Sequence, residues 1–139
     1  MSTLKLEIVT PEAKVFSQDV EMVFVPGVEG ELGILPRHIP LMTMIKPGEL
    51  RIYSGGQDTL LAVGEGFVEV TGDSVTVLTD MAIEEQNIDE SAAEAAVKRA
   101  EEALKHSKNI GDEEVASVEA SLERSLAQLQ VKRRKRHHA

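Results

Sequence analysis

The chain has 139 residues, of which 42% are hydrophobic but only 3% aromatic, and its formal net charge is −9. This hydrophobic content is too high for a disordered chain, and with so few aromatic side chains the core must be aliphatic. The absence of cysteine excludes disulfides and cysteine-based metal sites. Charged residues begin too early for a signal peptide and no run is long and apolar enough to span a bilayer, so we expect a soluble protein.

The charge is unevenly distributed along the chain. Up to Gln86, 5 Lys and Arg residues stand against 14 Asp and Glu, whereas the remainder has 10 of each. The second part ends in a basic run that consists of Lys132, Arg133, Arg134, Lys135 and Arg136. The acidic first part would repel nucleic acid, while the basic run would bind an anionic partner. The acidic pairs Glu84-Glu85 and Glu113-Glu114 are interpreted as solvated faces or as charges that favour a helix N-terminus.

The pattern of apolar and turn-forming residues in 1–86 predicts an antiparallel β-sandwich. Leu4, Leu6 and Ile8 alternate with charged residues, which places apolar side chains on one face of a strand. Further strands are expected at 20–25, 50–53, 59–63, 67–70 and 75–79, and short glycine-containing segments at 54–57, 64–66 and 71–74 predict hairpin connections. Because short strands follow one another without an intervening helix, an antiparallel sandwich or barrel is expected.

Residues 87–139 predict an antiparallel two-helix hairpin, so the fold class is α+β with domains at 1–86 and 87–139. Asp89 is expected to cap the first helix, Gly111 to end it and Asp112 to cap the second. The inner face of the first helix is rich in alanine and comprises Ala93, Ala96, Val97, Ala100, Ala103 and Leu104. The apolar stripe of the second helix comprises Val115, Val118, Leu122, Ser125, Leu126 and Leu129. At roughly 25 cal/mol per Å² such small side chains bury little, so we expect the hairpin to open or to exchange packing partners easily.

Three glycines, Gly27, Gly30 and Gly33, raise the question of a phosphate-binding loop. No Lys-Ser/Thr follows them and the next segment carries prolines, so turn geometry is the better interpretation. Without a P-loop the chain is not expected to be an ATPase, and no nucleophile–base constellation supports a small β-sandwich enzyme. His137 and His138 are too few, and too near the terminus, for a metal site. We therefore expect neither catalytic nor metal-binding residues.

The stretch Gly30–Leu41, with the sequence GELGILPRHIPL, resembles the signature loop of the epsilon subunit of bacterial F-type ATP synthases. Thr43, Ile45 and Lys46-Pro47-Gly48 follow it as they do in that family. Phe67–Val70 and the helical hairpin at the end of the chain also stand where the family has them. The resemblance covers nearly the whole chain.

The resemblance implies a non-catalytic rotor subunit in the central stalk of a proton-translocating ATP synthase. It implies a β-sandwich that docks on the gamma subunit and the c-ring, and a hairpin that either folds against the sandwich or extends into the alpha/beta catalytic head. In the extended state the second helix would inhibit ATP hydrolysis. The implied location is the cytoplasmic face of the bacterial plasma membrane, as a peripheral protein without membrane insertion. The residues that distinguish proton from sodium coupling lie on other subunits.

The family match places Glu31, Leu32, Arg37 and His38 on the surface that faces the c-ring and gamma. From chemistry alone, His38 is a loop histidine bonded to the local backbone, and the resemblance favours an interface role instead.

Some members of the family bind ATP through the motif Ile/Leu-Asp-x-x-Arg-Ala, which here reads Ile88-Asp89-Glu90-Ser91-Ala92-Ala93. The arginine is replaced by Ala92, which removes charge-assisted hydrogen bonds to phosphate. Ile88, Asp89, Arg99 and Arg124 remain as candidates for weak nucleotide contacts, and no physiological cofactor is expected.

The basic run 132–136 is interpreted as a regulatory tail. The family mechanism brings it near acidic loops of the beta subunits, so we expect its charges to favour the extended state, and we expect a solvated tail when nothing is bound. The alternative function is a free-standing nucleic-acid-binding protein, whose affinity would fall steeply with salt. The acidic first domain and the lack of an aromatic stacking platform argue against that alternative.

Overall fold

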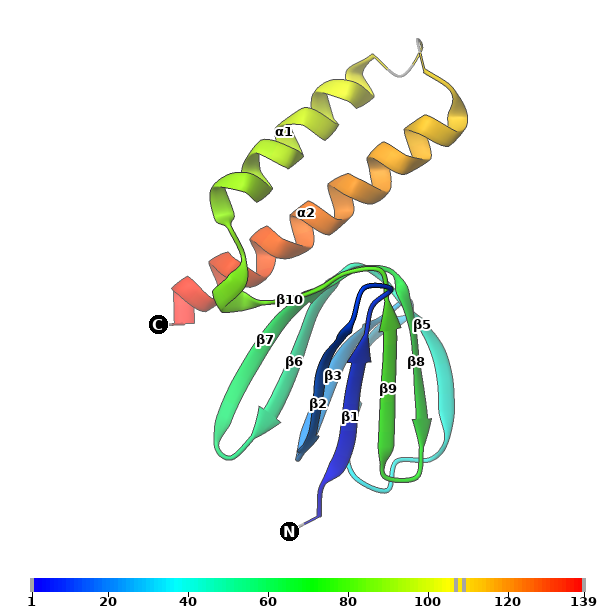
Figure 1. Ribbon diagram of the computed structural model, residues 1–139, viewed down its shortest axis with the longest axis vertical. Helices are drawn as coiled ribbons and strands as arrows, with labels where there is room; N and C mark the ends of the chain where they lie inside the picture. The colour runs from blue at the N-terminus through cyan, green and yellow to red at the C-terminus, as the bar shows by residue number, and fades with distance from the viewer. Residues whose placement is uncertain (1, 107, 109, 139) are drawn as a thin grey trace.

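The computed structural model describes residues 2–106, 108 and 110–138, with side chains up to residue 134. A curled sheet formed by the first part of the chain carries a pair of helices at one end (Figure 1). The strands are β1 (Leu4–Val9), β2 (Lys14–Val20), β3 (Met22–Gly27), β4 (Gly30–Ile34), β5 (Leu41–Ile45), β6 (Gly48–Ser54), β7 (Gln57–Val63), β8 (Gly66–Thr71), β9 (Ser74–Thr79) and β10 (Ala82–Glu84). The helices are the 3₁₀ turn η1 (Glu85–Asn87), α1 (Glu90–Lys105) and α2 (Asp112–His138).

The strands form one sheet in the order β10-β7-β6-β3-β5-β8-β9-β1-β2, with β4 added beside β3. All pairings are antiparallel except that of β1 with β9, which is parallel. The sheet folds around an aliphatic core to which β1 contributes Leu4, Leu6 and Ile8, each at most 1% exposed. The predicted β-sandwich followed by two helices is therefore confirmed. The alternating apolar side chains of β1 point into the core, as expected.

The hairpin turns follow the glycines. Ser54 pairs with Gln57 around Gly55 and Gly56, whose φ angles of 61° and 77° match the left-handed turn that a two-residue hairpin needs. Gly27 pairs with Gly30 to close the β3–β4 hairpin. The turn interpretation therefore holds for Gly27 and Gly30 but is wrong for Gly33, which lies within strand β4 and pairs with Phe24.

Strands β2, β4, β5 and β10 are absent from the sequence-based prediction. β4 lies in the glycine-containing signature stretch, where the pattern favours a loop. The ring of Phe24 covers Gly33, whose missing Cβ would lie 3.0 Å from Phe24 Cε1. The ring of Phe24, the residue that pairs with Gly33 on β3, thus fills the space that a side chain at position 33 would need.

The predicted helix cap is confirmed, but the predicted helix end is wrong. The carboxylate of Asp89 accepts the Ala92 amide at 3.0 Å. α1 ends at Lys105, well before Gly111, whose carbonyl instead accepts the Val115 amide at 3.0 Å as the cap of α2. α2 continues through the basic run, because Lys and Arg are good helix formers and favour the negative end of a helix dipole.

α2 lies between α1 and the sheet (Figure 1) and packs on both. Toward α1 the seam is thin, with Ala93 and Ala100 buried. Toward β6 and β7 a second core forms, made of Ala62, Ile88, Ala127 and Val131 with Leu60, Met81 and Ile83 at its edge. The sequence-based stripe of α2 missed this face and included Leu126, which is 46% exposed. Among the described residues, no helix has the length and apolar character needed to cross a membrane.

Candidate interaction surfaces

The basic end of α2 is paired with acidic side chains of the folded body. Lys132 Nζ lies 3.3 Å from Glu85 Oε1 and donates to the Glu85 carbonyl oxygen, also at 3.3 Å. Arg134 Nη1 pairs with Glu49 Oε2 on β6, and the side chain of Glu49 is only 5% exposed. These two cations therefore tie the end of α2 to η1 and to the sheet.

Arg133 binds two carboxylates of α1. Its Nε lies 3.2 Å from Glu90 Oε2 and its Nη2 lies 2.7 Å from Glu94 Oε1. The hydrogen bonds that Arg133 donates to Glu90 and to Glu94 raise the pKa of Arg133 above its usual value. Nine residues earlier on α2, Arg124 Nη1 lies 3.4 Å from Asp80 Oδ2, which precedes β10.

The solvated-tail expectation therefore fails for residues 132–134, which are helical and paired. The side chains of Lys135, Arg136, His137 and His138 lie outside the described residues. The side chain of Glu85 does not lie on a solvated face as expected, since it is only 20% exposed and bound to Lys132. No sequence signal points to these pairs, because the partners are separated by up to 85 positions in the chain.

The residues of the signature stretch lie at two ends of β4. Glu31 and Leu32 are on the strand and line a cleft of about 250 Å³, while Glu31 also lines a cleft beside Arg134 of α2. Arg37 and His38 lie in the loop after β4, so the four predicted interface residues do not converge on a single cleft.

The loop after β4 is held by backbone hydrogen bonds. Arg37 has a positive φ of 66°, and its amide donates to Asp73 Oδ1 at 2.9 Å, in the β8–β9 turn. The His38 amide donates to the Leu35 carbonyl at 3.2 Å, and His38 Nδ1 lies 2.8 Å from the Ile39 carbonyl oxygen, which suits a ring protonated at Nδ1. His38 thus makes the local contacts that its chemistry predicts.

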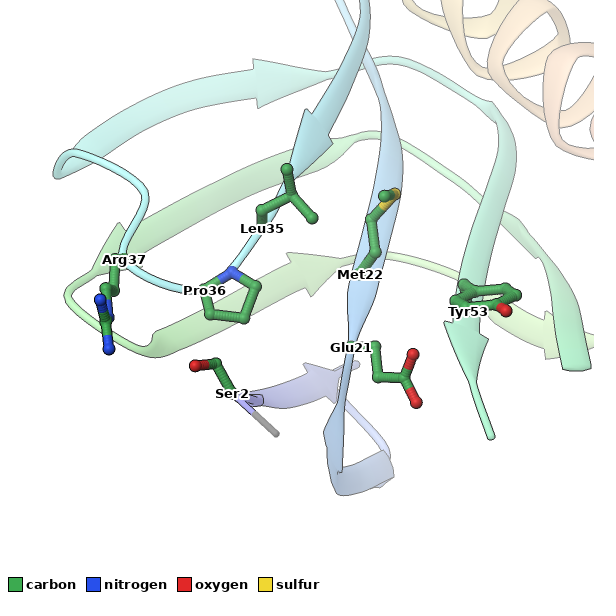
Figure 2. Close-up of a pocket in the computed structure, with 7 residues that line it drawn as sticks. All are labelled: Ser2, Glu21, Met22, Leu35, Pro36, Arg37 and Tyr53. Carbon is green, nitrogen blue, oxygen red and sulfur yellow. The ribbon is translucent and has the colours of Figure 1, made fainter. Parts of the chain in front are cut away.

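A largely apolar pocket of about 470 Å³ opens beside this loop, at the end of the sandwich where the N-terminus lies (Figures 1 and 2). Figure 2 shows Leu35, Pro36 and Met22 between Arg37 on one side and Tyr53 on the other. The seven lining residues are Ser2, Glu21, Met22, Leu35, Pro36, Arg37 and Tyr53.

One outer face of the sheet carries four exposed apolar side chains. Met44, Phe67 and Leu78 lie side by side on β5, β8 and β9, because Met44 pairs with Phe67 and Phe67 pairs with Leu78. Met42, on the same side of β5, adds to this row, and all four side chains are at least 37% exposed. We call these four residues the apolar row. The sequence signal for it is weak: in the stretch 41–45 four of the five residues are apolar and fall on both faces of the strand, with Thr43 between the two methionines.

The candidate nucleotide contacts are not gathered at one place. Ile88 is buried in the second core, Asp89 caps α1, and Arg124 pairs with Asp80. Arg99 lines a separate cleft of about 200 Å³ between the two helices, with Ala100 and Val118 among its neighbours. Among the described residues, no cluster of three or more acidic or histidine side chains could hold a metal ion.

The chain is a small β-sandwich with a helical hairpin docked on it, partly through ion pairs. Together with the exposed apolar row, this two-part arrangement defines a protein whose surfaces suit contacts with other chains. Two family models match it in succession: "ATP synthase, Delta/Epsilon chain, beta-sandwich domain" over residues 3–85, and "ATP synthase, Delta/Epsilon chain, long alpha-helix domain" over residues 86–133. The chain belongs to the family of ATP synthase delta/epsilon chains.

Curated relatives agree with this assignment over nearly the full length. The ATP synthase epsilon chain of Laribacter hongkongensis is 46% identical over 131 residues, covering 93% of this chain and 92% of that protein. The epsilon chain of Dehalococcoides mccartyi (strain BAV1) is 44% identical over 138 residues, covering 99% and 98%.

Solved structures share the fold. A chain in the Euglena gracilis mitochondrial ATP synthase structure, described as OSCP/F1/c-ring, matches with a TM-score of 0.73 and 22% identity, over 88% of this chain and 77% of that one. A chain in the Tetrahymena thermophila mitochondrial ATP synthase structure, described as central stalk/c-ring, matches with a TM-score of 0.54 and 14% identity, over 63% and 70%.

Proposed function

We propose that this chain is the central-stalk subunit that couples the catalytic head of the ATP synthase to the c-ring and inhibits ATP hydrolysis through its C-terminal helices. Family membership makes it an epsilon-type subunit without a catalytic role of its own. The coupling contacts and the inhibition are the parts that we propose.

The observation that carries the proposal is the way α2 is attached to the sandwich. Its second core contains four buried residues, two of which are alanines, with Leu60, Met81 and Ile83 packed at the edge. Around this core the helix is held by ion pairs whose members are mostly half-exposed. An interface of this kind has low local stability, so α2 can leave the sandwich while the larger aliphatic core stays folded. A helix released in this way can extend toward the alpha/beta head, where its basic end would meet acidic loops.

The apolar row supports a docking role for the sandwich. Contiguous exposed apolar side chains mark sites of protein–protein contact. The fold relatives come from structures described as F1/c-ring and central stalk/c-ring assemblies, which suits a row covered by gamma and a signature loop that faces the c-ring. We propose Glu31, Leu32, Arg37 and His38 as the residues of that second contact.

The proposal also states where the subunit lies and which ligands it binds. A subunit bound in this way is peripheral to the membrane, at its cytoplasmic face in a bacterium. Binding of ATP to the hairpin is proposed to be weak, because Ala92 stands at the position of the motif arginine. Nucleic-acid binding is disfavoured because Lys132, Arg133 and Arg134 are already paired with carboxylates.

The test is the ATPase rate of the synthase reconstituted with the full chain or with a chain that ends at Gln86. We expect the truncated chain to copurify with gamma and the c-ring, since the sandwich carries those contacts, and the ATPase rate to rise. A truncated chain that binds normally but leaves the rate unchanged would overturn the inhibitory role.

A further inference from the structure

The loop after β4 begins with a tight turn that has an arginine at its third position. The His38 amide donates to the Leu35 carbonyl at 3.2 Å, which closes a β-turn with Pro36 and Arg37 at its centre. Proline is common at the second position of both type I and type II turns, but only type II has a positive φ at the third. Arg37 has a φ of 66°, so the turn is of type II.

The third position of a type II turn favours glycine, because a side chain there is strained. Arg37 is the only residue other than glycine with a positive φ in the part of the chain that the structure describes. The alternative is a type I turn, in which the peptide between Pro36 and Arg37 is flipped and the φ of Arg37 is negative. An arginine by itself favours that alternative, so another part of the fold must hold the type II form.

Asp73 makes the contact that holds it. The amide of Arg37 belongs to the peptide that flips, and it donates to Asp73 Oδ1 at 2.9 Å. In a type I turn this amide would point the other way, and the hydrogen bond would be lost. Asp73 lies in the two-residue β8–β9 turn, and its own carbonyl oxygen accepts the Lys5 amide at 2.7 Å. A charge-assisted hydrogen bond from a fixed carboxylate thus stabilises the strained form of the turn.

The orientation of this peptide determines where the Arg37 side chain points. Arg37 is exposed and stands at one side of the apolar pocket, beside Leu35 and Pro36 of the same turn (Figure 2). Among the described residues, the ion pairs are made by other cations. An exposed guanidinium on a strained, externally held turn is suited to bind an acidic group of another molecule.

We propose that Asp73 is a positioning residue of the docking surface: it holds the turn in its type II form, and the turn then presents the Arg37 guanidinium to a carboxylate of the docked partner. This statement rests on the proposed function, which places the signature loop in that contact. Asp73 acts through Arg37 and does not itself need to touch the partner. Loss of the Asp73 carboxylate should therefore affect docking as loss of the Arg37 side chain does, and the two losses should not add.

The first experiment follows the turn in the isolated full chain by NMR. A type II turn brings the Hα of its second residue close to the amide proton of its third, so the nuclear Overhauser effect between Pro36 Hα and the amide of residue 37 reports the turn type. We expect this effect to fall by about twofold or more in Asp73→Ala and to be largely kept in Asp73→Asn, which retains an oxygen acceptor. Glu12→Ala, which removes a carboxylate from the exposed β1–β2 turn, is the control. An unchanged effect in Asp73→Ala would overturn the proposal.

A second substitution separates the shape of the turn from the side chain that it presents. Glycine adopts a positive φ without strain, so Asp73→Ala/Arg37→Gly should regain the type II effect although the hydrogen bond to Asp73 is gone. The double variant has no guanidinium, so it should not regain docking. If the type II effect is not regained, Asp73 acts on the fold as a whole and the proposal fails.

Docking is measured as the dissociation constant of each chain for a synthase from which this subunit has been removed. We expect Asp73→Ala and Arg37→Gly each to weaken binding about tenfold, as the loss of one charge-assisted contact does, and the double variant to bind as Arg37→Gly does. Asp73→Asn and Glu12→Ala should stay within about twofold of the wild type. A loss of about a hundredfold in the double variant would show that Asp73 acts independently of Arg37, against the proposal.

The outcomes separate this inference from the proposed function. If the wild type binds the depleted synthase and Asp73→Ala binds it equally well, the positioning role is overturned and the proposed function stands. If the wild-type chain itself does not bind, the proposed function is overturned, and the docking half of the inference falls with it.

Discussion

At the scale of single residues, the turn between β7 and β8 is fixed by close contacts. The hydroxyl of Thr79 donates to the Glu65 carbonyl at 3.0 Å and accepts the Gly64 amide at 3.2 Å. Gly66 begins β8 and pairs with Thr79 on the neighbouring strand β9, and a Cβ at position 66 would lie 1.8 Å from the carbonyl oxygen of Leu78. Because that oxygen belongs to the backbone, a side chain cannot be accommodated without moving a strand.

Gly66→Ala should therefore lower the free energy of unfolding of the sandwich by about 2–3 kcal/mol, as overpacking against backbone does. Urea unfolding followed by the fluorescence of Tyr53, the single tyrosine, measures this domain. Gly111→Ala is the matched control, because nothing lies within 4 Å of the Cβ it would add. Equal midpoints for the two variants would contradict the contact.

Ala92 permits a test of the nucleotide site. It is exposed in the first turn of α1, where an arginine would restore the motif of the ATP-binding relatives. Ala92→Arg should strengthen ATP binding about tenfold, which corresponds to one charge-assisted hydrogen bond. Titration calorimetry should find no such gain for Ala95→Arg, which adds the same charge at an exposed position one turn further along. Tight binding by the unmodified chain would show that other residues make the site.

At the scale of elements, α2 has one side buried against the sheet and another side exposed. Val131 is fully buried against the sheet, whereas Leu126 is 46% exposed. The packing of α2 against β6 and β7 thus depends on a few small buried side chains.

Val131→Ala should destabilise the docking of α2 by about 1–3 kcal/mol, since it removes buried methyl groups and leaves a cavity. Limited proteolysis should then cut α2 faster while the sandwich stays intact. Leu126→Ala removes more carbon from an exposed position and should change the cleavage rate little. If both variants are cut at the same rate, the second core does not hold the helix.

The sequence was sufficient where a pattern is local. Alternation of Leu4, Leu6 and Ile8 predicts β1, and Asp89 predicts the start of α1, because both signals lie within one element. The docked face of α2 has no such signal, because Ala127 is small and Val131 stands between Gln130 and Lys132. Their role becomes visible only once β7 lies beside them. The acidic partners of the basic run are hidden for the same reason: Glu49 is 85 positions away from Arg134.

At the scale of the whole molecule, the signature loop should serve assembly rather than folding. His38 bonds to nearby backbone, and Glu31 is exposed on β4. Replacing either by phenylalanine should impair coupled proton pumping of the assembled synthase while circular dichroism of the isolated chain stays unchanged. Glu12→Phe, in the exposed β1–β2 turn, is the control. A folded His38→Phe variant with normal pumping would remove that residue from the interface.

The parallel pairing of β1 with β9 has a consequence for how the chain is made. Leu6 pairs with Val75, so the first strand finds one of its two neighbours only after most of the sandwich has been synthesised. Contacts between residues so distant in sequence slow folding, because a long loop must close before they form. During translation, β1 and β2 can form a hairpin early, but its β9-facing edge stays open until residues 74–79 emerge. β9 is thus the segment that closes the domain, and the helices emerge only when the surface on which α2 docks is already complete.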